Sequence, residues 1–215
     1  FLGYFGSTLR CCNPGYESGS GTESDPYKIA TAEQLARLIN DTDTKGKYYE
    51  LTADIKLNDT KNAKWYEKGG NNEWYSVNDD RANHFNGTFD GKGHTVSGLY
   101  YGKTPGRDGW RSALFPMIGA GSVIRNVGVI NSYIKGKENA GGITAKNDSY
   151  GSIRNCYSIC TVSGYDDNAK VGGICGSSSY EIENCYSVSN GGVCSANSAT
   201  IGNCYYLSDS ETDDI

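Results

Sequence analysis

The sequence has few of the residues on which long helices and membrane spans depend. Nine of its 215 residues are leucine and one is methionine. No stretch approaches the roughly 18 consecutive apolar residues of a spanning helix, so we expect no insertion into a membrane. With only four prolines, and with glycines that keep no three-residue period, the chain is not collagen-like. A formal net charge of −5 argues against a nucleic-acid partner.

The sequence also lacks the short patterns of several catalytic and metal centres. It contains no Cys-x-x-Cys pair, no His-Glu-x-x-His motif, no Gly-x-Ser-x-Gly elbow and no Asp-x-Asp-x-Asp-Gly loop. The acidic residues gather in loops, as in Asp79-Asp80 and Asp166-Asp167, whereas a glycosidase needs two carboxylates facing one cleft. We therefore predict that the chain is not an enzyme and has no catalytic residue, metal site or cofactor.

Glycine, tyrosine, asparagine and cysteine are abundant instead, with 29, 17, 19 and eight residues. This composition suits short strands joined by tight turns. One helix is indicated at residues 31–40, because Thr31 and Gln34 have the spacing of a capping box and an apolar stripe follows them. The stripe consists of Leu35, Leu38 and Ile39. Residues 51–57 predict a strand, and the polar residues 58–84 are interpreted as a long insertion.

The second half of the chain repeats itself. Four copies of an Ile-x-Asn unit occur, and their asparagines are 29, 29 and 19 residues apart. The four asparagines are Asn126, Asn155, Asn184 and Asn203. Each copy carries a further apolar residue at a fixed distance, and these are Ile130, Ile159, Val188 and Leu207. Gly-Gly pairs alternate with the asparagines at Gly141, Gly172 and Gly191. Unequal spacing with a fixed internal register indicates a constant rung with variable loops, as in a β-solenoid.

Stacked rungs about 4.8 Å apart would align equivalent residues in columns. The asparagines would form an amide ladder at a corner, where asparagine tolerates left-handed backbone. The next position forms a second column, occupied by Val127, Cys156, Cys185 and Cys204. Because valine and cysteine share it, we expect mainly reduced cysteines that pack as small apolar residues. Disulfides, with Cys11 or Cys12 as the favoured partners, are the alternative. An antiparallel β-sandwich with coincidental spacing is the alternative fold.

Several segments resemble bacterial surface proteins with GLUG-type repeats. They are Thr31-Ala-Glu-Gln-Leu35, Leu51-Thr-Ala-Asp-Ile55, Phe85-Asn-Gly-Thr-Phe-Asp-Gly-Lys-Gly-His94 and the Ile-x-Asn-Cys-Tyr rungs. The resemblance covers residues 21–207 and implies a right-handed parallel β-helix outside the cell, as in filamentous-haemagglutinin-like adhesins. Similar repeats also precede the catalytic part of surface metallopeptidases that cleave immunoglobulin A.

We therefore expect an all-β fold, a right-handed parallel β-helix of five or six rungs with a short N-terminal capping α-helix. Residues 1–20 form an N-terminal extension or the end of a preceding segment. The β-helix domain covers residues 21–207, with the helix at 31–40, the insertion at 58–84 and the repeat rungs at 85–207. Residues 208–215 are interpreted as an acidic tail or linker.

Aromatic residues are the best indication of function. Tyr157, Tyr186 and Tyr205 follow the column cysteines, so strand alternation should point them outward. Further candidates for ligand binding are Trp65, Trp74, Tyr75 and Trp110. Exposed aromatic platforms stack on sugars or on protein partners, although tyrosine ladders also stabilise sheets.

The expected function is a non-catalytic module of a bacterial cell-surface or secreted protein, for adhesion or recognition of a glycan or a host surface protein. One alternative is a polysaccharide-acting β-helix enzyme, a glycosidase or lyase whose carboxylates come from the insertion. Another is a structural spacer or filament unit that self-associates through the ends of its β-helix.

Overall fold

The computed structural model describes residues 15–74, 84–102, 110–147, 149–189 and 191–207, and their fold is all-β apart from one α-helix and one short 3-10 helix. A seven-stranded sheet contains β1 (Tyr27–Ile29), β2 (Tyr48–Leu51), β4 (Thr88–Asp90), β8 (Val123–Arg125), β12 (Ser152–Arg154), β16 (Ile182–Glu183) and β19 (Ile201–Gly202). A six-stranded sheet contains β3 (Ile55–Lys56), β5 (Thr95–Ser97), β9 (Gly128–Gly136), β13 (Tyr157–Gly164), β17 (Tyr186–Ser187) and β20 (Tyr205–Tyr206).

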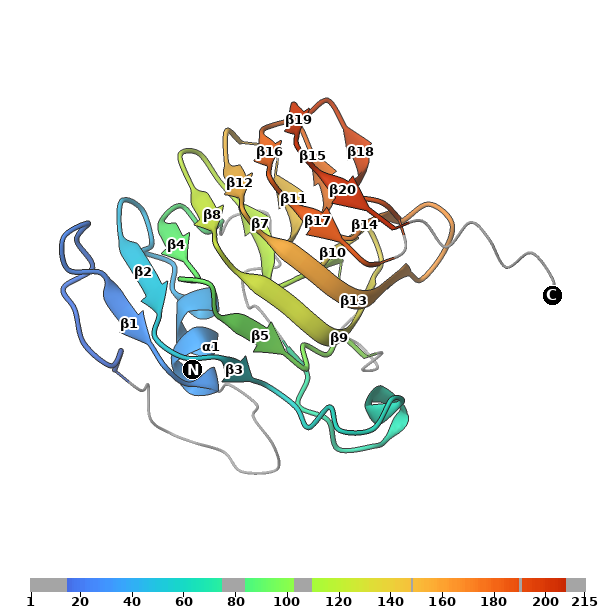
Figure 1. Ribbon diagram of the computed structural model, residues 1–215, viewed down its shortest axis with the longest axis horizontal. Helices are drawn as coiled ribbons and strands as arrows, with labels where there is room; N and C mark the ends of the chain where they lie inside the picture. Colours follow the sequence, from blue (N-terminus) through green and yellow to red (C-terminus); the bar gives the residue numbers. More distant parts are fainter. Residues whose placement is uncertain (1–14, 75–83, 103–109, 148, 190, 208–215) are drawn as a thin grey trace.

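Two smaller sheets complete the β structure. One contains β6 (Arg111–Ser112), β10 (Asn139–Gly141) and β14 (Lys170–Gly172). The other contains β7 (Phe115–Ile118), β11 (Thr144–Asn147), β15 (Cys175–Ser178) and β18 (Cys194–Asn197). In every sheet the spatial order of the strands follows their order in the chain, and the pairings between these strands are parallel (Figure 1). The chain therefore returns to each sheet in turn and adds its next strand beside the previous one.

The repeat units lie directly on one another. Ile153 is in register with Ile124 on one side and Ile182 on the other, and Ile182 is in register with Ile201. The first three of these isoleucines are completely buried, because their side chains point to the shared interior. This inward column, together with Phe89, is part of one apolar core that extends along the stack. The spacing of the Ile-x-Asn units thus predicts the strand register correctly.

The asparagine corner has the backbone that the sequence predicts. The four asparagines have φ between 49° and 55°, in the left-handed region. The side-chain amide of Asn155 donates to Asn126 Oδ1 at 3.1 Å, and Asn203 donates to Asn184 Oδ1 at 3.2 Å. Asn126 in turn donates to Asp90 Oδ1 at 2.9 Å. Burial acts to raise the pKa of Asp90, but hydrogen bonds from Asn126 and the Lys92 backbone and the charge of Arg125 hold it below its usual value.

The Gly-Gly pairs form a second corner where side chains do not fit. A Cβ at Gly142 would overlap Ser158 Oγ, and a Cβ at Gly173 would overlap Ser187 Oγ. Each glycine therefore lets the backbone of one unit approach the serine side chain of another unit closely. Gly142 and Gly173 directly follow β10 and β14 of the three-stranded sheet, so this close approach lies at the corner between the three-stranded and four-stranded sheets.

Helix α1 (Ala32–Asn40) lies at the N-terminal end of the stack, between β1 and β2 in the chain (Figure 1). The predicted capping box is present, because Thr31 Oγ1 accepts from the Gln34 backbone and Gln34 Oε1 accepts from the Thr31 backbone. Leu35, Leu38 and Ile39 are buried. The apolar stripe of this helix therefore covers the first end of the core.

The predicted single strand at residues 51–57 is wrong. The structure has β2 ending at Leu51 and β3 beginning at Ile55, with a bend between them. Asp54 lies in this bend, and its carboxylate accepts a hydrogen bond from the Thr95 backbone at 2.8 Å and lies 3.3 Å from His94 Nδ1. The two short strands belong to different sheets, so residues 51–57 contain a corner of the chain.

Candidate binding face

The outer side of the six-stranded sheet carries a ladder of tyrosines. Tyr157 is in register with Tyr186, and Tyr186 with Tyr205. The rings of Tyr157 and Tyr186 stack with their centroids 5.0 Å apart and their planes within 2°. A Cβ at Gly128 would overlap the Tyr157 ring, so glycine in the preceding unit makes room for it. Tyr157 is therefore half-buried between neighbours, whereas Tyr186 and Tyr205 are 44% and 72% exposed.

A column of aliphatic side chains runs beside the tyrosine ladder. Ile159, Val188 and Leu207 lie two residues after the three tyrosines and are exposed on the same face. Aliphatic side chains of this size are usually buried, since their burial stabilises a protein. A group of them exposed side by side on one sheet is therefore typical of a surface that contacts a partner or ligand. We call the six residues of the two columns the tyrosine face. It consists of Tyr157, Tyr186, Tyr205, Ile159, Val188 and Leu207.

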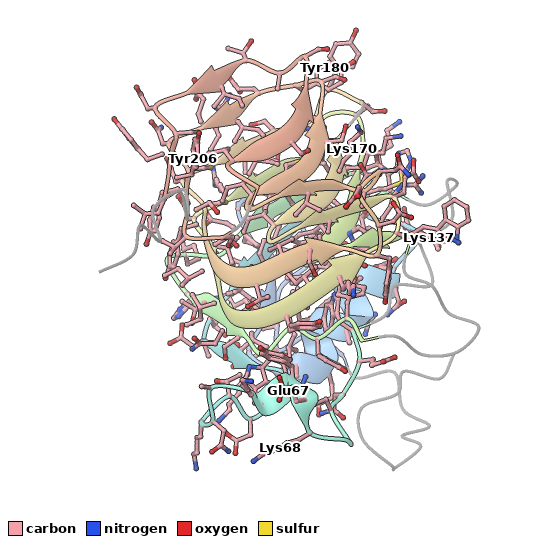
Figure 2. The ribbon with its side chains drawn as sticks, turned by 90° about the vertical axis from the view of Figure 1, so that its right-hand side faces the viewer. Glu67, Lys68, Lys137, Lys170, Tyr180 and Tyr206 are labelled. Atoms are coloured by element: carbon pink, nitrogen blue, oxygen red, sulfur yellow. The ribbon has the colours of Figure 1, made fainter. Side chains whose placement is uncertain are left out.

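The insertion forms a wall along one side of this face. Its 3-10 helix η1 (Trp65–Glu67) presents Tyr66, whose ring stacks on Tyr133 of β9 with centroids 4.3 Å apart and planes within 13°. Trp65 makes an edge contact with the Tyr100 ring at 5.8 Å. Figure 2 shows this segment, labelled at Glu67 and Lys68, below the long strands β9 and β13. Aromatic contacts thus fix the insertion against the sheet.

A groove of about 310 Å³ lies between the insertion and the sheet. Thr60, Asn62 and Tyr66 line it on the insertion side. Ile159 and Val188 of the tyrosine face line the opposite side. All the lining residues are uncharged, and they combine apolar surface with amide and hydroxyl groups. A second hollow of about 470 Å³ is lined by Lys56, Leu57 and residues of the insertion, and by no residue of the tyrosine face.

The structure contradicts the prediction that the insertion tryptophans are exposed platforms. Trp65 and Trp74 are only 5% and 3% exposed. Trp74 belongs to the main core, and its indole N–H donates to the Leu114 carbonyl at 3.3 Å. A polar sequence around a tryptophan suggests a solvated loop, but here the rings pack against other parts of the chain. Both residues therefore pack mainly against the chain, and Trp65 reaches the groove only with the small part of its surface that is left exposed.

The remaining aromatic candidates lie apart from this groove or outside the described residues. Tyr75 lies outside the described residues. Trp110 is exposed just before β6, and Lys137 Nζ lies 4.9 Å from its ring centroid. Sequence reasoning missed Tyr66 and Tyr133. Alternation along β9 could have placed Tyr133 on an outer face, whereas its contact with Tyr66 depends on the path of the insertion.

The cysteine column lies directly behind the tyrosine ladder. Cys156 and Cys185 are buried, Cys204 is half-buried, and all three are thiols in this structure. The Cys156 backbone N–H donates to Cys185 Sγ at 3.4 Å, and the Cys185 backbone N–H donates to Cys204 Sγ at 3.4 Å. Cys11 and Cys12 lie outside the described residues. Within the described part of the chain, no group of three or more His, Cys, Asp or Glu residues could hold a metal ion.

No family model matches the chain. Halomucin of Haloquadratum walsbyi is 31% identical over 161 residues, which is 75% of this chain and 2% of halomucin. A protein named "Putative Gly-rich membrane protein" of Evansella cellulosilytica is 31% identical over 119 residues, which is 55% of this chain and 12% of that protein. The chain thus spans a small part of the length of either relative. Among the described residues, no helix has the length and apolarity to cross a membrane.

A solved structure, described as "a putative immunoglobulin A1 protease from Bacteroides ovatus", resembles this chain with a TM-score of 0.53 and 19% identity. The match covers 93% of this chain and 82% of the other. At this identity the likeness shows the fold alone. The chain therefore shares an all-β architecture of parallel sheets with that protein.

Proposed function

We propose that the chain is a right-handed parallel β-helix of the GLUG-repeat kind, displayed at a bacterial cell surface, whose tyrosine face binds a neutral glycan without chemical change. The observation that carries this proposal is the continuous exposed surface of Tyr186, Tyr205, Ile159 and Val188 beside an uncharged groove. The similarity to halomucin and to a Gly-rich membrane protein supports the surface location.

A glycan fits this surface because a sugar ring has an apolar face and a polar rim. The apolar face can pack on the exposed ring of Tyr186 or Tyr205 and on the neighbouring aliphatic side chains. The polar rim can exchange hydrogen bonds with the amide of Asn62 and the hydroxyl of Thr161 in the groove. Since no charged residue lines this groove, a neutral sugar is favoured over a uronic acid. A hydrolase would need paired carboxylates there.

Binding of the full chain to an array of neutral and acidic glycans tests the proposal. We expect binding to neutral glycans, weakened about tenfold or more by Tyr186→Ala, because loss of one aromatic contact costs roughly 1.4 kcal/mol or more. Trp110→Ala is the control, because Trp110 is 51% exposed, close to the 44% of Tyr186, and does not line the groove. Equal losses in the two variants, or no loss in Tyr186→Ala, would contradict the assignment of the binding face.

Self-association is a second candidate, favoured by the last strands in each sheet. β18, β19 and β20 are edge strands of the described part. Ile201 of β19 is 39% exposed, whereas Ile182, its register partner in β16, is completely buried. An edge strand with apolar neighbours is able to pair with a second copy. Sedimentation velocity over a concentration series distinguishes the two functions, since a glycan-binding monomer keeps one sedimentation coefficient.

A further inference from the structure

The cysteine column has an odd number of thiols, and its geometry selects one pair. The tyrosines that follow Cys185 and Cys204 are in register in parallel strands, so neighbouring Cα atoms lie about 4.8 Å apart. A disulfide requires a Cα separation of about 4.4–6.8 Å. The Cys185 backbone N–H also donates to Cys204 Sγ, which places that sulfur against its neighbour. Cys156 and Cys185 satisfy the same requirement, so distance alone does not decide between the two pairs.

Accessibility decides between them. Oxidation by a small disulfide begins when a protein sulfur attacks it, so one partner must be reachable from solvent. Cys156 and Cys185 are both 1% exposed, whereas Cys204 is half-buried. Cys185 is the column neighbour of Cys204. Burial raises the pKa of Cys204, so its thiolate is scarce near neutral pH and the reaction is slow.

We propose that Cys185 and Cys204 form a disulfide when the protein meets a low-molecular-weight disulfide such as oxidised glutathione. The Cys204 thiolate attacks one sulfur of the small disulfide, which forms a mixed disulfide and releases one small thiol. Cys185 then loses its proton and its sulfur attacks Cys204 Sγ, which releases the second small thiol. Two protein thiols are oxidised by two electrons, and one small disulfide is reduced to two thiols.

The bond joins the last two repeat units directly behind the tyrosine ladder. Cys185 precedes Tyr186 and Cys204 precedes Tyr205, so the cross-link fixes the two most exposed ladder tyrosines relative to each other. It also ties β20, an edge strand, to β17. The inference goes beyond glycan binding, because the bond forms or fails to form whether or not a glycan binds.

The test treats the full chain with oxidised glutathione and maps the disulfides after chymotryptic digestion without reduction. Cleavage after tyrosine places Cys185 in residues 181–186, and it places Cys194 and Cys204 together in residues 187–205. We expect a cross-link between these two peptides, and loss of two alkylatable thiols from them. Cys204→Val should abolish the cross-link, because Val127 shows that the column accepts valine. Cys194→Thr should retain it, because Thr144 occupies the corresponding place in its own column.

Three results would overturn the proposal. They are a cross-link that survives in Cys204→Val, a disulfide between Cys156 and Cys185, and complete alkylation of Cys204 after oxidation. If Cys204→Val does not fold, as judged by far-ultraviolet circular dichroism, Cys185→Val removes the other partner and must abolish the same cross-link. The disulfide is detected by the masses of peptides and not by glycan binding. A chain that binds no glycan can therefore still show the cross-link, so failure of the disulfide proposal is distinguishable from failure of the proposed function.

Discussion

Replacement of Asn155 tests the corner that sets the whole stack. Its φ of 53° lies in the left-handed region, and its amide donates to Asn126 at 3.1 Å. In Asn155→Ala the lost hydrogen bond costs about 0.5–1.5 kcal/mol, and alanine in this backbone region costs about 1–2 kcal/mol. Because asparagine tolerates that region better than alanine, we expect a loss of about 2 kcal/mol in the free energy of unfolding.

Asn155→Gly loses the same hydrogen bond but is free of left-handed strain. Glycine also has more freedom in the unfolded chain, which costs about 0.5–1 kcal/mol. These costs are partly offset because glycine also removes the left-handed strain that asparagine carries, so we expect a loss of about 1–1.5 kcal/mol, smaller than that of alanine. In an ordinary strand or helix the order is the reverse, with glycine worse by about 0.5–1 kcal/mol.

Urea unfolding followed by circular dichroism measures both variants, and midpoints are compared where the slope with denaturant is unchanged. Ser152→Ala and Ser152→Gly are matched controls three residues earlier in β12, where the usual order should hold. If Asn155→Gly is less stable than Asn155→Ala, the left-handed backbone of the corner does not determine which residue is best there.

Three further predictions concern the core, the cap and the bend. Trp74→Ala should lose about 3–5 kcal/mol of unfolding free energy in a urea titration, because a buried indole and its bond to Leu114 disappear. Thr31→Ala should lower the free energy of unfolding by about 1 kcal/mol in the same assay, because the capping box is broken. Thr31→Ser should keep most of the stability of the wild type. The Thr95 backbone hydrogen bond lowers the pKa of Asp54, so the carboxylate stabilises the fold above the unfolded pKa and this stabilisation is lost as pH falls through the folded value. Acid titrations should therefore show a steeper loss of stability below about pH 4 in the wild type than in Asp54→Asn.

Local patterns in the sequence determine most of the fold and can be recognised there. The Ile-x-Asn units carry both the inward isoleucine and the left-handed corner, so their spacing predicts the register of β8, β12, β16 and β19. The capping box of α1 is equally local, since Thr31 and Gln34 contact each other. The tyrosine ladder follows from strand alternation after the corner.

The wall of the groove could not be predicted because it depends on contacts between distant residues. Tyr66 meets Tyr133 across 67 positions of the chain, and Trp74 reaches Leu114 across 40. No periodicity marks such partners. A polar composition at residues 58–84 suggests solvent exposure, whereas Trp65, Tyr66 and Trp74 pack against other parts of the chain.

Hydrogen bonds attach the insertion to the repeat units and hold its aromatic residues beside the tyrosine face. The Asn58 amide donates to the carbonyls of Gly98 and Asn72, and Asn58 Oδ1 accepts from the Asn72 backbone at 2.7 Å. The Trp74 backbone then donates to the Tyr100 carbonyl at 2.8 Å. Asn58 and Trp74 are thus both fixed to the repeat units, which holds the residues between them, Trp65 and Tyr66 included, against the sheet. Tyr186 and Tyr205 keep more exposed rings than the buried tryptophans of the insertion, and the proposed glycan binding therefore depends on these two tyrosines.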